Sequence, residues 1–437
     1  MVLAVALGVL AALAAAAGAR TASAGRLTPA AGASPHFLVA GRAPVVRQAG
    51  TVLFDCQRNT NPVPVKCYGP DQIRAAYGVQ ELLDRGINGS GRTIVIVDAF
   101  GSPTIAQDLH LFDQAWGLPD TTLNVVAPDG IGTGDPDEVL GWAVETSLDV
   151  EWAHVIAPDA AIDLVIGKTN DDADMLSALT YAVNQNLGDT ISMSFGEAEQ
   201  CMDSTLFANQ HTLFQQALAQ KMTLFASTGD FGAAQPTCDG SDVFKAASTP
   251  ASDPDVTGVG GTSLRADAVT GYYFSERVWN EYLESGAAGG GGFSSFFSRP
   301  SFQTGSNVYS PQRGLPDVSY NAGIAGGVLV FITLGPPFFD PGTYVFIVGG
   351  TSAGSPQWAG LAALADQIKG GRLGTINPTL YDLAKLPSYS TSYFHDILVG
   401  QNSFPPVSGY PALLGWDAAS GLGSPRANNL VPALASH

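Results

Sequence analysis

The sequence predicts an α/β protein whose central β-sheet is mostly parallel and flanked by helices on both faces. Three observations support this prediction. Short apolar runs suited to buried strands recur along the chain, segments with a helical pattern alternate with them, and hydrophobic residues make up 45% of the 437 positions. Strands that alternate with helices favour parallel pairing, because each helix carries the chain back to the start of the next strand.

The expected strands are continuous runs rich in β-branched residues, as in parallel strands buried on both faces. They span residues 93–100, 162–167, 190–195 and 222–227. The helical patterns span residues 141–156, 173–185, 205–220 and 355–369. The Gly-rich segment 286–300 lacks the strand–GxGxxG–helix context of a phosphate site, so we expect a surface or cleft loop there. Residues 387–425 predict irregular structure, because they are rich in Gly, Pro, Ser and aromatic side chains.

The N-terminus has the features of a secretory signal. Residues 2–17 are apolar, and Ala22-Ser23-Ala24 supplies a small-residue cleavage site, so residues 1–24 predict a signal peptide. Residues 25–65 have weak periodicity and predict a short pro-segment or an N-terminal arm. Residues 66–437 would form the catalytic domain. No later run of 18 uncharged apolar residues occurs, so we expect a secreted, extracellular protein with no membrane contact after signal removal.

The charge balance excludes some partners and favours some conditions. Asp and Glu number 39 against 20 Lys and Arg, which gives a net charge of −19. Such a protein repels nucleic acid. At pH 3–4 many of its carboxylates would be neutral, so self-repulsion would fall, which suits work in acid. The alternative explanation is that an acidic surface only aids solubility.

Four cysteines, an even number, fit the oxidising environment outside the cell. Proximity in the sequence favours the pairs Cys56–Cys67 and Cys201–Cys238. The spacing does not match a zinc site.

A candidate nucleophile, Ser352, lies in the segment GGTSAGSPQW (349–358). A Gly-rich turn delivers it to the start of an amphipathic helix, where free backbone N–H groups can stabilise an oxyanion. The alternative is an ordinary N-cap serine. The string GTSA-x-x-P is more specific than a cap and matches the nucleophile segment of subtilisin-like folds.

A serine nucleophile needs a base, and none of the six histidines is followed by Gly, as a His-Gly-Thr motif would require. Glu145 and Asp149 offer carboxylates instead. Their i, i+4 spacing puts both on one face of a strongly apolar helix, where a buried pair can share a proton. The alternative is a solvated acidic face.

A third carboxyl group, Asp230, follows an apolar strand and lies between Gly229 and Gly232. Functional groups of α/β sheets gather at such strand ends. A protonated Asp230 could donate a hydrogen bond to an oxyanion. The alternative is a turn formed by Asp-Phe-Gly.

Together these segments resemble the sedolisin family, the serine-carboxyl peptidases, which have a subtilisin-like fold with glutamate in place of histidine. The resemblance covers about residues 66–437 and rests on E-x-x-x-D, S-x-G-D-x-G and G-T-S-A-x-x-P in the family's order. It implies that Glu145 is the general base and acid, that Asp149 orients it, that Ser352 attacks and that Asp230 helps to form the oxyanion hole. SMSFG (192–196) resembles the strand that pairs with the peptide substrate.

The resemblance also implies one structural calcium ion. FHDILVG (394–400) and LLGWDAASGLG (413–423) are similar to the family's calcium segments, and oxygen ligands suit this hard cation. The carboxylates of Asp396 and Asp417 would bind it. The backbone carbonyls expected beside them belong to Ile397, Leu413 and Gly415. The alternative is that the two aspartates cap turns.

Two positions depart from the family pattern. Asp98 stands where some relatives have glutamate, and Phe195 stands where some have tryptophan. Phe195 cannot donate a hydrogen bond, so the network behind the catalytic carboxylates must differ. The family also usually has a large folded pro-domain, whereas only residues 25–65 are available here for that role.

The resulting expectation is a secreted serine-type endopeptidase that hydrolyses proteins and peptides at acidic pH through an acyl-enzyme on Ser352. It would be a monomer. One alternative is a catalytically inactive relative that binds peptides or surfaces. Another is a histidine-dependent peptidase that pairs Asp98 with His110 or His154.

Overall fold

A computed structural model describes residues 32–437 except 44, 49–50, 58–65 and 305–307. Its centre is an eight-stranded sheet in the order β16-β15-β11-β9-β6-β8-β7, with β21 also paired to β15. Every pairing in it is parallel except that of β15 with β16. The predicted fold class is therefore confirmed. The strands are β6 Thr93–Ala99, β7 Leu123–Val126, β8 Ala161–Gly167, β9 Thr190–Met193, β11 Thr223–Ser227, β15 Thr257–Ala266, β16 Tyr273–Val278 and β21 Val318–Asn321.

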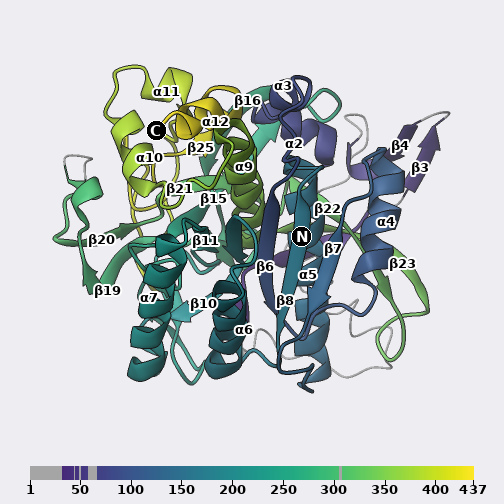
Figure 1. Cartoon of the computed structure of the whole chain (residues 1–437), viewed down its shortest axis with the longest axis horizontal. Helices are drawn as coiled ribbons and strands as arrows, with labels where there is room; N and C mark the ends of the chain where they lie inside the picture. Colours follow the sequence, from purple (N-terminus) through teal and green to yellow (C-terminus); the bar gives the residue numbers. More distant parts are fainter. Residues whose placement is uncertain (1–31, 44, 49–50, 58–65, 305–307) are drawn as a thin grey trace.

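Helices cover both faces of this sheet because each central strand is apolar on both sides. In β6, Ile94 and Ile96 pack in one core cluster, while Val95 and Val97 pack in the other. The first cluster includes side chains of α4, α5 and α9, and the second includes side chains of α6 and α7, which stand side by side in Figure 1. The bounds are α4 Ile105–Trp116, α5 Pro136–Ile156, α6 Asp172–Asn184, α7 Ser204–Ala219 and α9 Gly354–Lys369.

Helix α5 carries polar groups into the interior. It begins at an N-cap, Asp135, whose side chain accepts the Asp137 N–H, and Pro136 fills the first helical position. Every residue from Trp142 to Ile156 is buried. The helix is buried all round because it packs between β22, β6 and α9. Acidic residues in this stretch therefore lie in the core.

A second sheet leads the chain to Ser352. It contains β2 Leu38–Arg42, β23 Gly342–Gly349, β22 Gly327–Leu334 and β5 Cys67–Tyr68, in that order. Strand β23 ends two residues before η3 (Thr351–Ala353). A third sheet joins β1 Ser34–Pro35 to β10 Phe195–Ala198 and β14 Ser248–Thr249. The link between β1 and β2 therefore passes beside Ser352.

The Gly-rich segment differs from the expected loop, because it contains short strands on either side of Gly289–Gly291. A Cβ added at Gly290 would lie 2.0 Å from the Thr228 carbonyl oxygen, so glycine there permits contact between two backbones.

The remaining elements are β3 Val45–Gln48, β4 Thr51–Phe54, η1 Asp55–Gln57, α2 Pro70–Ala76, α3 Gln80–Leu83, β12 Ala234–Pro236, β13 Val243–Lys245, β17 Asn280–Glu281, α8 Tyr282–Ser285, β18 Ala287–Ala288, β19 Gly292–Ser298, η2 Ser301–Gln303, β20 Gln312–Leu315, α10 Asn377–Ala384, α11 Tyr389–Ser392, β24 Phe394–His395, β25 Ser424–Pro425 and α12 Ala427–Ala435.

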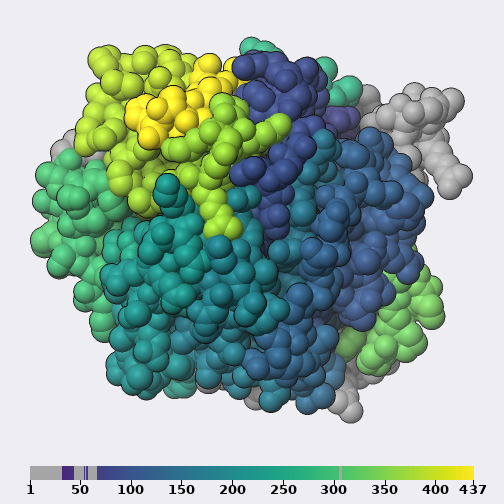
Figure 2. All heavy atoms as spheres, in the orientation of Figure 1, coloured from purple at the N-terminus to yellow at the C-terminus, as the bar shows by residue number. Residues whose placement is uncertain are grey.

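The C-terminal region is largely irregular, as expected, and its last helix packs against the start of the domain. The Ala427 N–H donates to the Tyr77 carbonyl, and Asn428 donates to Glu81. Figure 2 shows this contact as yellow atoms beside the indigo atoms of α2 and α3. Residues near 80 and near 430 therefore belong to one domain.

Both expected disulfides, Cys56–Cys67 and Cys201–Cys238, are formed. The predicted signal peptide, residues 1–24, lies outside the described residues, as do residues 25–31 and 58–65 of the predicted pro-segment or arm. Within the part that is described, none of the helices has both the length and the apolar character needed to cross a bilayer.

Candidate active site

Ser352 lies in the turn between β23 and α9, fully buried. Its hydroxyl donates to the Ser194 carbonyl at 3.1 Å and accepts the His36 N–H at 3.1 Å. Its own N–H points to the His36 carbonyl oxygen at 3.0 Å. A backbone N–H next to a serine hydroxyl is the arrangement needed to attack a carbonyl and to stabilise the resulting oxyanion.

The N-terminal segment lies across this serine in the manner of a bound peptide. Strand β1 pairs antiparallel with β10, with Ser34 opposite Gly196 and Pro35 opposite Phe195. The His36 N–H lies 3.3 Å from the Ser194 carbonyl oxygen. Addition of a strand to a sheet edge is a common mode of peptide recognition. The expected peptide-pairing role of residues 192–196 is thus matched by a segment of the chain itself, which the sequence did not predict.

The His36 ring occupies a pocket and does not act on Ser352. Its Nδ1 lies 2.8 Å from the Ser227 hydroxyl, and burial lowers the pKa of His36 to about 4. His110 contacts Asp120 at the surface, and buried His154 contacts Asp113. Within the described residues, neither histidine makes a hydrogen bond or an ion pair with Ser352 or Asp98. The geometry therefore does not support the histidine-dependent alternative.

Glu145 and Asp149 lie one turn apart on α5, and both are fully buried. Burial, first, and then the charge of Asp149 raise the pKa of Glu145 well above its usual value, while the nearby Ser352 hydroxyl, which donates to Ser194 in this structure, opposes the shift. Burial and the charge of Asp98 likewise raise the pKa of Asp149. Each carboxyl group acts on the pKa of the other, and neither has a hydrogen-bond partner among the described residues, so the buried pair retains protons. The solvated acidic face considered as an alternative is therefore wrong.

Asp98 makes this pair a cluster of three carboxyl groups. It lies in β6, it is fully buried, and burial raises its pKa to about 7, although the nearby Thr146 hydroxyl opposes the shift. Phe195 packs against Trp142, with ring centroids 6.2 Å apart. The tryptophan of this region therefore comes from α5, and its indole N–H has no acceptor among the described residues.

Asp230 follows β11 and faces the turn that carries Ser352. One carboxyl oxygen accepts the N–H and the hydroxyl of Thr351, both at 2.9 Å, and the other is buried without a partner. Burial raises the pKa of Asp230 to about 8, so the group keeps its proton in acid. A Cβ added at Gly350 would lie 2.3 Å from the His36 carbonyl oxygen and 2.7 Å from the free Asp230 oxygen. Both oxygens therefore border one small space.

The candidate calcium residues meet in one loop near the C-terminus. The Leu413 N–H donates to Asp417 at 2.8 Å, and the Gly415 N–H donates to Asp396 at 3.2 Å. Asp417 is 2% exposed, and Ala419 and Ser420 hold its other oxygen. The carboxylates of Asp396 and Asp417 offer oxygen donors of the kind that Ca²⁺ prefers.

Comparison with known proteins gives consistent relatives, although no protein-family model matches the chain. Kumamolisin from Bacillus sp. (strain MN-32) is 34% identical over 415 residues, which cover 92% of this chain and 68% of kumamolisin. Sedolisin from Pseudomonas sp. (strain 101) is 32% identical over 347 residues, which cover 76% of this chain and 56% of sedolisin. Tripeptidyl-peptidase 1 from Dictyostelium discoideum is 28% identical and is covered to 58%.

A solved structure of Pseudomonas sedolisin, a serine-carboxyl proteinase complexed with two molecules of pseudo-iodotyrostatin, superposes with a TM-score of 0.73. The match covers 85% of this chain and 99% of the other, at 28% identity.

The carboxyl cluster makes a prediction about stability. Asp98 and Asp230, with pKa values raised to about 7 and 8, keep protons in the native state that the unfolded chain loses above about pH 4. The native state then binds more protons, so the free energy of unfolding falls as pH rises, by about 1.4 kcal/mol per pH unit for each such proton. His36 and His395, with pKa values lowered to about 4 and 3, oppose this below about pH 6.5.

We therefore expect the melting temperature to fall most steeply between about pH 6.5 and 8. Calorimetry on the Ser352→Ala protein, which stays intact, measures this, and Asp98→Asn should flatten the fall. A melting temperature that rises over this interval would contradict the account.

Proposed function

The chain belongs to the sedolisin family of serine-carboxyl peptidases and is a serine-type endopeptidase by class, and we propose that it is secreted and cleaves proteins at acidic pH. Ser352 would be its nucleophile, and Glu145 its general base and acid. The observation that carries the proposal is the His36 carbonyl, which the Ser352 N–H holds at 3.0 Å while the neighbouring backbone pairs with β10. Two disulfides are compatible with secretion.

The proposed chemistry uses the groups around that carbonyl. The Ser352 hydroxyl attacks the carbonyl carbon, and Glu145 takes its proton, while Asp149 holds the Glu145 carboxyl in place. The oxyanion accepts hydrogen bonds from the Ser352 N–H and from the protonated Asp230. Glu145 then gives the proton to the leaving amine, and an acyl-enzyme remains on Ser352. Water then attacks the acyl carbon while Glu145 removes its proton, and Glu145 returns that proton to the Ser352 oxygen as the bond between this oxygen and the acyl carbon breaks and the acid is released.

The alternative of an inactive relative has no support in the site. Inactive relatives of an enzyme family lack or misplace a reacting group, but here the Ser352 hydroxyl is close enough to act on the pKa of Glu145, and Asp230 borders the held carbonyl. This arrangement supports the proposal of an active enzyme.

The pH dependence of hydrolysis tests the function. When the N-terminal segment leaves the cleft, water reaches the carboxyl cluster, so its upward pKa shifts, which arise mainly from burial, should shrink. Glu145 can then lose its proton in acid while Asp230 keeps its own. We expect casein hydrolysis to peak between about pH 3 and 5 and to be largely lost by about pH 7. Ser352→Ala is the control, and a maximum near pH 8 would refute the mechanism.

The oxyanion role of Asp230 can be separated from a role in folding. Asp230→Ala removes one donor and should lower kcat by about 10²–10³-fold. Asp230→Asn keeps a donor at every pH, so it should retain more activity than the alanine variant. Stopped assays at pH 4 and melting curves on the same samples measure both properties. Two variants that melt early but keep wild-type kcat would show that Asp230 only shapes the turn.

The position of the N-terminal segment also suggests how the chain matures. We propose that Ser352 cuts the His36–Phe37 bond of its own chain, so that residues 25–36 form the pro-segment and Phe37 becomes the mature N-terminus. The part after the cut includes β2, which pairs with β23 and thus belongs to the domain.

N-terminal sequencing after a shift to pH 4 should find Phe37 in the wild-type protein. Ser352→Ala should remain uncut at this bond. In the wild-type protein the extent of cutting should not depend on dilution, because we propose an intramolecular reaction. A mature N-terminus beyond Arg42, or the same cut in Ser352→Ala without added peptidase, would rule out this assignment.

We further propose that one calcium ion binds at Asp396 and Asp417, with backbone carbonyls of Ile397, Leu413 and Gly415. The ion would supply positive charge to two partly desolvated carboxylates, and would tie residues 394–400 to residues 413–423. Because a ligand of the native state stabilises it by mass action, a chelator should lower the melting temperature. Asp417→Ala should abolish that sensitivity, whereas Asp382→Ala, at an exposed ion pair, should preserve it. A chelator that leaves the wild-type melting curve unchanged would argue against the site.

A further inference from the structure

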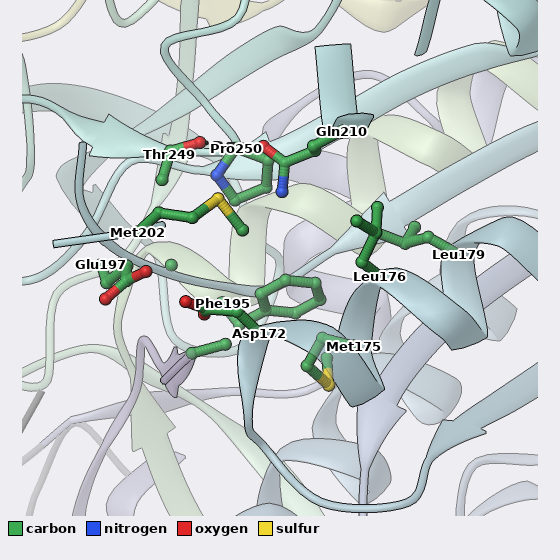
Figure 3. Close-up of a pocket in the computed structure, with 12 residues that line it drawn as sticks. Asp172, Met175, Leu176, Leu179, Phe195, Glu197, Met202, Gln210, Thr249 and Pro250 are labelled. Carbon is green, nitrogen blue, oxygen red and sulfur yellow. Dashed lines mark hydrogen bonds between the residues drawn. The ribbon is translucent and has the colours of Figure 1, made fainter. Parts of the chain in front are cut away.

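A cavity next to the N-terminal segment is not used by the proposed chemistry. It lies between β10, the start of α6 and residues 249–250, and Ala33 lines one side of it. Its walls are mostly apolar, with Met175, Leu176 and Phe195 among them. Figure 3 shows that two carboxyl groups, Glu197 and Asp172, point toward each other at this cavity. Apolar walls with acidic groups at one end would suit a long side chain with a charged tip.

The register of the strands places Ala33 opposite Glu197. Ser34 pairs with Gly196 and Pro35 with Phe195, so the next antiparallel position joins Ala33 to Glu197. Residues directly opposite in an antiparallel pair have side chains on the same face. The Ala33 backbone is also fixed by hydrogen bonds to Asn170 at 2.9 and 3.2 Å. A longer side chain at this position would extend from the backbone into the cavity.

Glu197 needs a partner that the described residues do not provide. It is 5% exposed, and neither carboxyl oxygen has a donor among those residues. The carboxyl group of Asp172 acts on it, and no cation is among the groups that act on either one. Burial, and then the charge of Asp172, raise the pKa of Glu197 to about 9. Two carboxyl groups that share one proton keep one negative charge, and a buried charge is stabilised by a cationic partner.

We propose that this cavity is the binding site for the fourth residue before the cleaved bond, and that it prefers lysine or arginine. With His36 as the residue before the bond, Ala33 is that fourth residue. The aliphatic stem of a basic side chain would pack on Met175, Leu176 and Phe195, and its charged tip would meet Glu197 and Asp172. The alanine side chain leaves the cavity unfilled, so at this position the chain's own segment gains little binding energy from its side chain. This proposal rests on the proposed function.

Peptides that differ only at this position test the preference. The series has Lys, Arg, Leu, Ala or Glu before Ser-Pro-His-Phe, and kcat/KM is measured with the processed enzyme at pH 4.5. We expect the Lys and Arg peptides to exceed the Ala peptide by about ten-fold or more, as for a hydrogen bond to a charged group, and the Glu peptide to fall below it. A Leu peptide that equals or exceeds both would overturn the basic preference.

Variants identify the group that is responsible. The double variant Glu197→Gln/Asp172→Asn should remove most of the advantage of Lys over Leu, because it removes the negative charge that the two carboxyl groups share and keeps their shape. Asp171→Asn is the matched control, because it removes a neighbouring exposed charge that does not line the cavity. It should leave the preference intact. A preference that persists unchanged in the double variant would overturn the assignment.

A measurement without catalysis separates this proposal from the proposed function. In the uncut Ser352→Ala chain, Ala33→Lys should raise the melting temperature relative to Ala33→Leu by about 1–3 °C, and the added pair Glu197→Gln/Asp172→Asn should cancel the difference. If no peptide is cleaved, the proposed function fails while this cycle still tests the cavity. If peptides are cleaved and the cycle shows no coupling, the cavity assignment fails alone.

Discussion

Three buried carboxyl groups, which have no positive partner among the described residues, constrain the whole of this molecule. Asp98, Glu145 and Asp149 lie in the core, where an isolated negative charge is costly, so they must keep protons and pass them to one another. A histidine in the same place would become a cation in acid and lose its ability to accept a proton. The carboxyl cluster therefore sets both the range of pH in which the chemistry can run and the range in which the fold is most stable.

Helix α5 carries two of the three groups, together with buried Glu151 and His154, and its apolar side chains pack in the core beside β6, β22 and α9. Asp230 lies apart from them, beyond the turn that holds Ser352, and keeps its own proton. Separation of the two acidic regions allows one to accept a proton while the other donates a hydrogen bond.

Much of the fold could be predicted from the sequence, because its signals are local. Apolar runs marked the central strands, and i, i+4 spacing put Glu145 and Asp149 on one face of a helix. The position of residues 33–37 could not be predicted, because a short segment without periodicity meets a residue 316 positions away. Burial of Glu197 was equally hidden, since an acidic residue after a strand normally faces solvent. The glycines at 289–291 have a role that only the approach of Thr228 defines.

The covalent link between His36 and the strand that follows it keeps residues 33–36 in the cleft at a very high effective concentration. While the link is intact, any other peptide must compete with a segment that cannot diffuse away. Once it is cut, the residues before the break depend on their own affinity alone, and the single methyl group of Ala33 contributes little to that affinity. The residues after the break keep their ladder with β23. Cutting one bond would thus change a segment that blocks the cleft into two parts. The residues before the bond become a weakly bound product that dilution removes, and the residues after it remain as a fixed edge of the groove.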